Sequence, residues 1–330
     1  MKRWIRWTCW LWAFGCAAPA GAAGGELLEL VKTIALPGVS GRIDHMTLDA
    51  AAGRLYIAAL GNNTLEVVDL AQGKHLRSLA GFGEPQGVVH VAAANRLFVA
   101  NGSADRVDIL DGASLAPLAH ISGMADADNV RLDAREGLVY AGYGSGALRV
   151  LDARSGESRG EVALAGHPES FQLEQSGTRI FVNVPTAKHV AVIDRATRKV
   201  AATWGLQGAG SNFPMALDEG AHRLYVGTRS PAALLVYNTQ SGALTERITI
   251  GGDVDDVFFD PATKRLYAVC GEGVVSVIAQ TDADHHTVLG TVKTASRART
   301  GLFDPASHQL FVAVPAGLLG TAELRVYRAH

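Results

Sequence analysis

Residues 96–101 read Arg-Leu-Phe-Val-Ala-Asn, and six other segments of the chain repeat this pattern of one polar or small residue before an apolar run. The seven copies begin at Arg54, Arg96, Gly137, Arg179, Arg223, Arg265 and Gln309, at intervals of 41 to 44 residues. A period in the low forties is typical of propellers in which each repeat is a small four-stranded sheet. We therefore predict an all-β fold, a seven-bladed β-propeller of four-stranded antiparallel blades.

The first repeat shows four strands separated by turns. We expect them at residues 46–49, 54–58, 65–69 and 75–79, where β-branched and aromatic residues alternate with turn formers. Runs that are apolar on both faces, such as Leu-Tyr-Ile, fit strands packed between neighbouring blades. On this pattern the blades start near residues 42, 84, 126, 167, 211, 253 and 297.

The two ends of the repeat region predict how the ring closes. Residues 28–36 read as a strand that belongs to no repeat, and the last repeat ends at residues 324–327, in its third strand. Pairing the two completes the seventh blade and leaves no open sheet edge. We expect one propeller domain over residues 23–330, closed by strand 28–36.

The N-terminus predicts export from the cytoplasm. Lys2, Arg3 and Arg6 precede an apolar stretch over residues 7–18 and a run of small residues over 19–23. This is the pattern of a signal peptide over residues 1–22, and its apolar stretch is too short to span a bilayer. We expect a periplasmic or secreted protein without a transmembrane segment. Lipid attachment at Cys16 is a minor alternative.

Composition excludes several classes of protein. With 48% hydrophobic and 19% charged residues, the chain is not disordered. Its formal net charge of −2 becomes −5 without the three basic residues of the signal peptide, which argues against nucleic-acid binding. Cys270 is then the one cysteine left, and its strand-like surroundings indicate a buried thiol. We expect a monomer.

Three of the second strands carry a family resemblance. They read Leu-Phe-Val-Ala-Asn at 97–101, Ile-Phe-Val-Asn at 180–183 and Leu-Tyr-Val-Gly at 224–227, followed by strands such as Val-Ile-Asp at 192–194. Here the chain resembles the YVTN-repeat, YncE-like propellers over nearly all of its predicted mature length. The resemblance implies the propeller fold. It implies no single activity, because architecture rather than chemistry unites these proteins.

Many charged residues have a structural explanation. Short acidic side chains at strand ends accept hydrogen bonds from the following turn. We assign this role to Asp49, Asp133, Glu174, Asp218, Asp260 and Asp304 after first strands and to Asp69, Asp111, Asp152 and Asp194 after third strands. The arginines before second strands are predicted to lie at the surface, as are His285 and His286 in a long polar turn.

The remaining polar residues precede the first strands. Five residues before each first-strand end stand Asp44, Gln86, Asp128, Glu169, Phe213, Asp255 and Arg299, and seven before it stand Arg42, Glu84, Asp126, His167, Ser211, Asp253 and Arg297. First strands are innermost in a propeller, so these lead-in segments should converge on one mouth of the central channel. Eight acids sharing one mouth, including Asp256, require a cation or the arginines of blades one and seven. A purely solvating role for these residues remains an alternative.

The first functional hypothesis is a binding scaffold, a class that needs no cofactor. Its ligand would be a protein segment or a small cationic or polar molecule at the channel mouth. The predicted ligand-binding residues are Asp44, Gln86, Asp128, Asn129, Glu169, Asp255, Asp256 and Arg299. Loop residues that could add contacts are Asn62, Asn101, Tyr143 and Arg229.

The alternative hypothesis is a metal-dependent hydrolase or lyase, similar in architecture to propeller lactonases, at the same mouth. A divalent ion, Ca²⁺, Mg²⁺ or a first-row transition metal, would be held by some of Asp44, His45, Asp128, His167, Glu169 and Asp255. His45 or Glu169 would act as the general base and Arg299 would stabilise an oxyanion. The chain contains no haem-attachment, zinc-protease or nucleophile-elbow motif.

Overall fold

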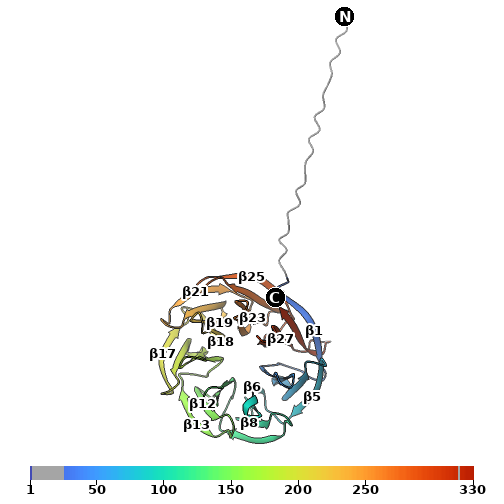
Figure 1. Ribbon diagram of the computed structural model, residues 1–330, viewed down its shortest axis with the longest axis vertical. Coiled ribbons are helices and arrows are strands. Elements are labelled where there is room, and N and C mark those ends of the chain that lie inside the picture. Colours follow the sequence, from blue (N-terminus) through green and yellow to red (C-terminus); the bar gives the residue numbers. More distant parts are fainter. Residues whose placement is uncertain (2–25, 319) are drawn as a thin grey trace.

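The computed structural model describes residue 1, residues 26–318 and residues 320–330. The described strands form seven four-stranded antiparallel sheets arranged in a ring (Figure 1), which confirms the predicted propeller. The predicted signal peptide and Cys16 fall on residues 2–25, outside the described part of the chain. Within that part, no helix combines the length and apolar character needed to cross a membrane.

The first four blades follow the chain in order. Blade one contains β2 (Met46–Asp49), β3 (Arg54–Ala59), β4 (Thr64–Asp69) and β5 (Lys74–Ala80). Blade two contains β6 (Pro85–Val91), β7 (Arg96–Asn101), β8 (Arg106–Asp111) and β9 (Pro117–Ser122). Blade three contains β10 (Val130–Asp133), β11 (Leu138–Tyr143), β12 (Ala147–Asp152) and β13 (Ser158–Ala163). Blade four contains β14 (Phe171–Leu173), β15 (Arg179–Val184), β16 (His189–Asp194) and β17 (Lys199–Gly205).

The last three blades complete the ring. Blade five contains β18 (Gly210–Asp218), β19 (Arg223–Ser230), β20 (Ala232–Asn238) and β21 (Leu244–Thr249). Blade six contains β22 (Val254–Asp260), β23 (Arg265–Cys270), β24 (Val274–Gln280) and β25 (His286–Lys293). Blade seven contains β26 (Gly301–Asp304), β27 (Gln309–Val314), β28 (Ala322–Ala329) and β1 (Leu28–Leu36). Three short 3₁₀ turns, η1 (Leu60–Asn62), η2 (Ala92–Ala94) and η3 (Pro185–Ala187), lie between strands.

The N-terminal strand closes the ring as predicted. β1 pairs antiparallel with β28, with Leu28 opposite Ala329 and Leu36 opposite Ala322, and it forms the outer edge of blade seven (Figure 1). Leu28, Ile34 and Leu36 are buried, whereas Leu30 is exposed. The first and last strands of the propeller are therefore held in one sheet by hydrogen bonds and by apolar packing.

An aromatic residue recurs at the centre of every blade. It is the third residue of each second strand, and in all seven blades its side chain is almost completely buried: Tyr56, Phe98, Tyr140, Phe181, Tyr225, Tyr267 and Phe311. A buried aromatic side chain removes about 150–250 Å² from water, so this position contributes much of the core between blades. The sequence repeat therefore corresponds to a buried aromatic side chain at the same position of every blade.

The turn carboxylates have their predicted role. Asp49 accepts a hydrogen bond from the Ala52 amide at 3.1 Å, and Asp152 accepts one from the Ser155 amide at 2.9 Å. Similar bonds from backbone amides reach Asp133, Asp218, Asp260, Asp304, Asp69, Asp111 and Asp194, and Glu174 accepts one from the Arg179 amide at the start of β15.

Two surface predictions are wrong. The side chain of His286 is buried, with Nδ1 2.6 Å from Glu246 Oε2 and Nε2 3.2 Å from the Tyr225 hydroxyl, because β25 packs it against blade five. Arg223 is also buried, and its guanidinium donates to Asp284 at 2.7 Å. His285 is exposed, as predicted.

Candidate functional site at the channel mouth

Lead-in residues from five blades meet at one end of the central channel, which we call the channel mouth. Asn129 Nδ2 lies 3.3 Å from His45 Nε2, and His45 Nδ1 lies 3.6 Å from Asp256 Oδ1. Blades three, one and six are joined in this way across the channel. Three further ion pairs link blades at the mouth. His167 of blade four pairs with Asp128 of blade three, and Asp255 of blade six pairs with both Arg42 of blade one and Arg299 of blade seven.

Several of the lead-in segments contain a residue with left-handed backbone. The residue seven positions before the first-strand end has a positive φ in five blades: Glu84, Asp126, Ser211, Asp253 and Arg297, with φ between 47° and 68°. Such left-handed backbone costs about 1–2 kcal/mol per L-residue, and polar residues tolerate it better than branched apolar ones. These five positions therefore have a turn-forming role of their own. Glu84 and Asp126 are exposed at the rim.

We predicted that linkers before the inner strands form the channel mouth. In blades two, five and six the inner strands themselves extend to the mouth. β6, β18 and β22 begin earlier than other inner strands, and their pairing shifts register between Pro85 and Val88, Asn212 and Met215, and Val254 and Asp256. A bulge re-aims the side chains on its strand. In β22 the two successive carboxylates take different partners: Asp255 pairs with Arg299, and Asp256 faces His45 and accepts from the Gly301 amide at 2.8 Å.

One half of the mouth is rich in arginine. Arg229 pairs with Asp255 and lies 3.2 Å from Asp253 Oδ1, while Arg299 Nε lies 3.0 Å from Asp255 Oδ2. Phe213, the one apolar member of the lead-in set, lies beneath Arg229, with 4.1 Å between the guanidinium carbon and the ring centroid. A cation over an aromatic face is attracted by the ring, which explains the phenylalanine. Burial raises the pKa of Asp255 despite its arginine partners.

The centre of the mouth is a buried polar layer. Asp44 is fully buried, and Arg42 lies 2.8 Å from its Oδ2, although neither carboxylate oxygen has a well-aligned hydrogen-bond donor. Burial raises the pKa of Asp44 to about 6. Burial opposes charge on His45, but the carboxylates of Asp256 and Asp44 outweigh it and raise the pKa of His45 to about 10. His45 is therefore a cation at neutral pH.

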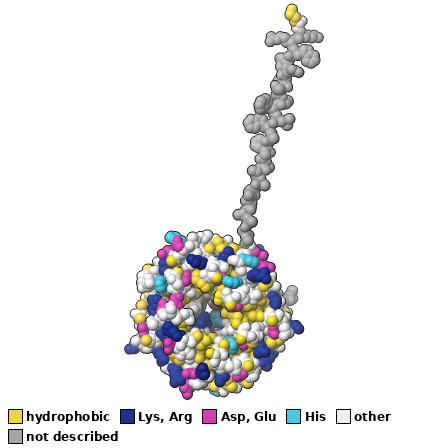
Figure 2. Space-filling view, viewed as in Figure 1, with side chains coloured by type: hydrophobic (Ala, Val, Ile, Leu, Met, Phe, Trp, Pro, Cys, Tyr) yellow, Lys and Arg dark blue, Asp and Glu magenta, His cyan; other side chains and the backbone are white. Residues whose placement is uncertain are grey.

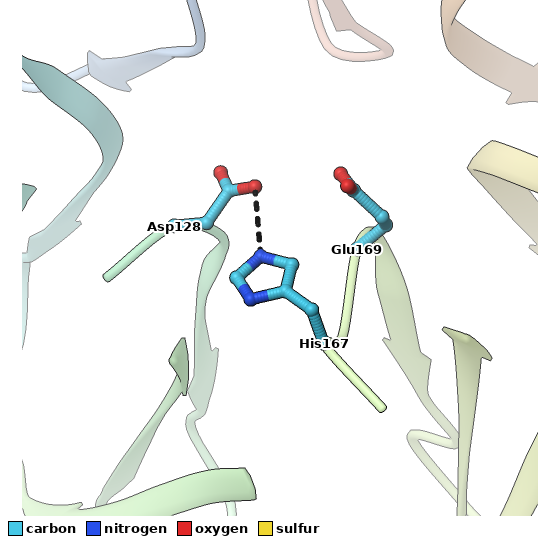
Figure 3. A group of neighbouring side chains, drawn as sticks. All are labelled: Asp128, His167 and Glu169. Atoms are coloured by element: carbon cyan, nitrogen blue, oxygen red, sulfur yellow. Dashed lines mark ion pairs between the residues drawn. The ribbon is translucent and has the colours of Figure 1, made fainter. Parts of the chain in front are cut away.

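The other half of the mouth holds Asp128, His167 and Glu169, whose side chains point toward one another (Figure 3). His167 Nε2 lies 3.8 Å from Asp128 Oδ2, and Nδ1 lies 2.7 Å from the Gly144 carbonyl oxygen. Burial opposes charge on His167, but the Asp128 carboxylate and the Gly144 carbonyl outweigh it and raise its pKa to about 9. Burial and the neighbouring Asp128 carboxylate raise the pKa of Glu169 to about 8. Among the described residues, Glu169 has no ion-pair partner.

A cavity continues into the channel below this layer. Its volume is about 220 Å³, and its lining includes His45, Asp256, Arg131, Ser170 and Gln172. The space-filling view shows the ring hollowed at its centre (Figure 2). At about 30 Å³ per water molecule, the cavity would accommodate several waters or a small chemical group. Arg131 lies outside the predicted set, because it follows the lead-in positions and belongs to β10.

The remaining predicted residues differ in position. Gln86 lies at the rim, with Nε2 3.4 Å from Asp126 Oδ1. Of the loop candidates, Arg229 reaches the mouth. Asn101 is buried at the end of β7, where its amide donates to Asp108, and the hydroxyl of Tyr143 donates to Glu161 on an outer strand. Asn62 accepts from the Ser40 amide.

Comparison with known proteins supports the fold alone. No family model and no curated protein matches the chain. A chain in the crystal structure of the Mitotic Checkpoint Complex superposes with a TM-score of 0.78 and 16% identity, covering 99% of both chains. A chain of Kuenenia stuttgartiensis hydrazine synthase gives a TM-score of 0.72 and 14% identity, covering 84% of this chain and 95% of the other. The protein is, by fold, a seven-bladed β-propeller.

Proposed function

We propose that this propeller is a binding scaffold of the YVTN-repeat, YncE-like kind, and that it holds a ligand or partner segment at the channel mouth. The fold supports this because a closed ring presents convergent side chains from several blades on a rigid frame. One observation carries the proposal: Asp128 and Glu169 are close together, and no Lys or Arg among the described residues lies within ion-pair distance of either carboxylate.

The charges of the mouth indicate what kind of ligand fits. Arg42, Arg229 and Arg299 are matched by the nearby aspartates, so that half of the mouth is balanced. The half around Asp128 and Glu169 has His167 as its cationic partner. A ligand that places a positive group between the two carboxylates would relieve their repulsion. We therefore favour a cation-bearing polar molecule, or a partner segment that inserts Lys or Arg.

Thermal-shift titration tests this proposal. Putrescine, free arginine and a lysine-rich peptide serve as probes, each in the presence of a metal chelator. We expect at least one probe to raise the melting temperature of the wild type and to lose its effect in Asp128→Asn and Glu169→Gln. Glu136→Gln is the matched control, because Glu136 is exposed in the turn after β10, at the opposite end of that strand. A shift that survives both mouth substitutions would refute the proposal.

Export is the second part of the proposal. The basic residues and apolar stretch at the N-terminus support a signal peptide that is removed after Ala22. Mass spectrometry of the mature protein distinguishes a free Ala23 from an acylated Cys16, and retention of residues 1–22 would contradict export by this route.

A metal-dependent hydrolase or lyase is the second candidate, and the donor set of Asp128, His167 and Glu169 is the observation that favours it. For such a reaction Glu169 would be a metal ligand rather than the general base, and His45, the other candidate base, is held as a cation between two carboxylates. Arg299 would have to leave Asp253 and Asp255 to stabilise an oxyanion. Hydrolysis of simple lactones by Zn²⁺-supplemented protein, lost in Glu169→Gln, would support this function. A lack of turnover would count against it.

A further inference from the structure

We propose that Asp128, His167 and Glu169 bind one divalent first-row transition-metal ion, such as Zn²⁺. The inference rests on the proposed ligand site and names the cation it takes. One ligand atom from each residue lies within 4.8 Å of the other two (Figure 3). Two carboxylates and one imidazole form a mixed donor set that suits such an ion, whereas Ca²⁺ and Mg²⁺ prefer oxygen donors alone.

His167 is already oriented as a ligand. Its Nδ1 donates to the Gly144 carbonyl at 2.7 Å, and this bond turns Nε2 toward Asp128 Oδ2. Metal-binding histidines commonly donate their second ring nitrogen to a carbonyl or carboxylate, which fixes the tautomer and the ring plane. The same geometry makes the inward nitrogen of His167 the atom that an ion would bind, with displacement of the proton that faces Asp128.

Little movement would complete the site. Ligand atoms about 2.1 Å from a tetrahedral ion are roughly 3.4 Å apart. The 3.8 Å between His167 Nε2 and Asp128 Oδ2 is close to that value. Glu169 has no ion-pair partner among the described residues, so rotating its side chain breaks no such contact. The backbones of both segments are fixed, since the Asp128 amide donates to Gly142 and the Glu169 amide to Asn183.

Unsatisfied polar groups beside the cluster provide an independent observation. Asn129 is 2% exposed, and its side-chain oxygen has no hydrogen-bond partner, although its Nδ2 lies 3.4 Å from Asp128 Oδ1. Asp44 is fully buried in the same layer, where Arg42 lies 2.8 Å from its Oδ2 while its Oδ1 has no hydrogen-bond partner. Buried polar atoms without partners are rare in folded proteins. A hydrated ion bound at the cluster would supply donors through its water molecules.

Metal titration of the purified, chelator-treated protein tests the site. Isothermal titration with ZnCl₂ should show one ion per chain, and CoCl₂ should give visible absorption from a bound, low-coordinate ion. We expect Glu169→Gln and His167→Gln each to weaken Zn²⁺ binding at least about tenfold, since loss of even a supporting residue costs about 10- to 100-fold. His285→Ala is the control, because His285 and Asp282 form an exposed imidazole–carboxylate pair away from the mouth.

Several results would overturn the proposal. These are no stoichiometric Zn²⁺ binding, binding unchanged in Glu169→Gln, binding lost in His285→Ala, or tighter binding of Ca²⁺ than of Zn²⁺. Glu169→Gln keeps the size of the side chain, so circular dichroism in chelator should show a folded variant even if His167→Gln unfolds. If amines or peptides bind in chelator and need Asp128 while Zn²⁺ does not bind, the metal site is refuted and the binding scaffold stands.

Discussion

Replacing Leu36 by alanine should destabilise the propeller by opening the packing that closes the ring. Leu36 is the last residue of β1 and is fully buried. It packs in an apolar cluster with Ile34, Leu55, Phe311 and Leu324, between blades seven and one. Truncating a buried leucine to alanine removes its transfer free energy and leaves a cavity, and the loss is commonly 2–5 kcal/mol. We expect a decrease of about 3 kcal/mol in the free energy of unfolding.

The same strand provides a matched control. Leu30 is 48% exposed and lies opposite Tyr327 in the pairing of β1 with β28. Leu30→Ala makes the same chemical change, but about half of the side chain is already in water, so we expect a loss of about 1 kcal/mol or less. Both variants change strand propensity in the same way, so the difference between their losses of unfolding free energy measures the effect of burying Leu36.

Urea denaturation followed by circular dichroism measures both variants against the wild type. An unchanged slope of free energy against urea is required, because a changed slope would indicate a partly folded state. Equal losses for Leu36→Ala and Leu30→Ala would refute the role of β1 in closure. Deleting residues 27–38 removes all the buried side chains of β1 together and should strongly lower the melting temperature, and an unchanged value would refute the same reasoning.

Three further predictions address single groups. Arg195→Met should cost about 3–5 kcal/mol in urea denaturation, because it leaves the buried carboxylate of Asp133, now 3.0 Å from Arg195, without its charge partner; a loss below about 1 kcal/mol would contradict this. Burial raises the pKa of Cys270 to about 12, so iodoacetamide at about pH 8 should label it far more slowly in the native protein than in urea; equal rates would exclude a buried thiol. His45 has a folded-state pKa of about 10, above its ordinary 6.5, so its stabilisation is complete below about pH 6.5 and is lost as the pH rises through 10. The unfolding free energy of the wild type should therefore fall more steeply than that of His45→Gln between about pH 7 and 10, and parallel curves would contradict this assignment.

The blades could be predicted from sequence because their signal is local. The four strands of the first repeat were placed to within one residue at each end, and strand 28–36 was placed at its observed bounds. Each strand is short, bounded by turn residues and repeated seven times, so aligning the seven copies defines the strand boundaries better than any single copy does. The turn carboxylates were predicted for the same reason, since their partners lie two to five residues away.

Contacts between residues that are distant in the sequence, and irregular strand pairing, could not be predicted in this way. His286 is buried by Tyr225, 61 residues away, and Phe213 is explained by Arg229 of the next strand. The register shifts in β6, β18 and β22 are equally invisible in a repeat pattern, because a bulge changes pairing without changing composition. The sequence indicated that polar residues meet at one mouth. Which of them pair with arginine, and which do not, depends on side-chain directions that only the assembled ring defines.

Ring closure and the channel mouth are connected through blade one. β1 ends at Leu36, and Asp44 and His45 follow within nine residues on the way to β2. The segment is also held from blade seven, where the Thr300 hydroxyl donates to the Ile43 carbonyl at 3.2 Å. His45 in turn contacts blades three and six. The strand that closes the ring therefore also positions the central cation of the mouth, so a ligand that needs this layer in place binds the closed ring better than an opened one. By linkage, such a ligand must stabilise closure by the same free energy.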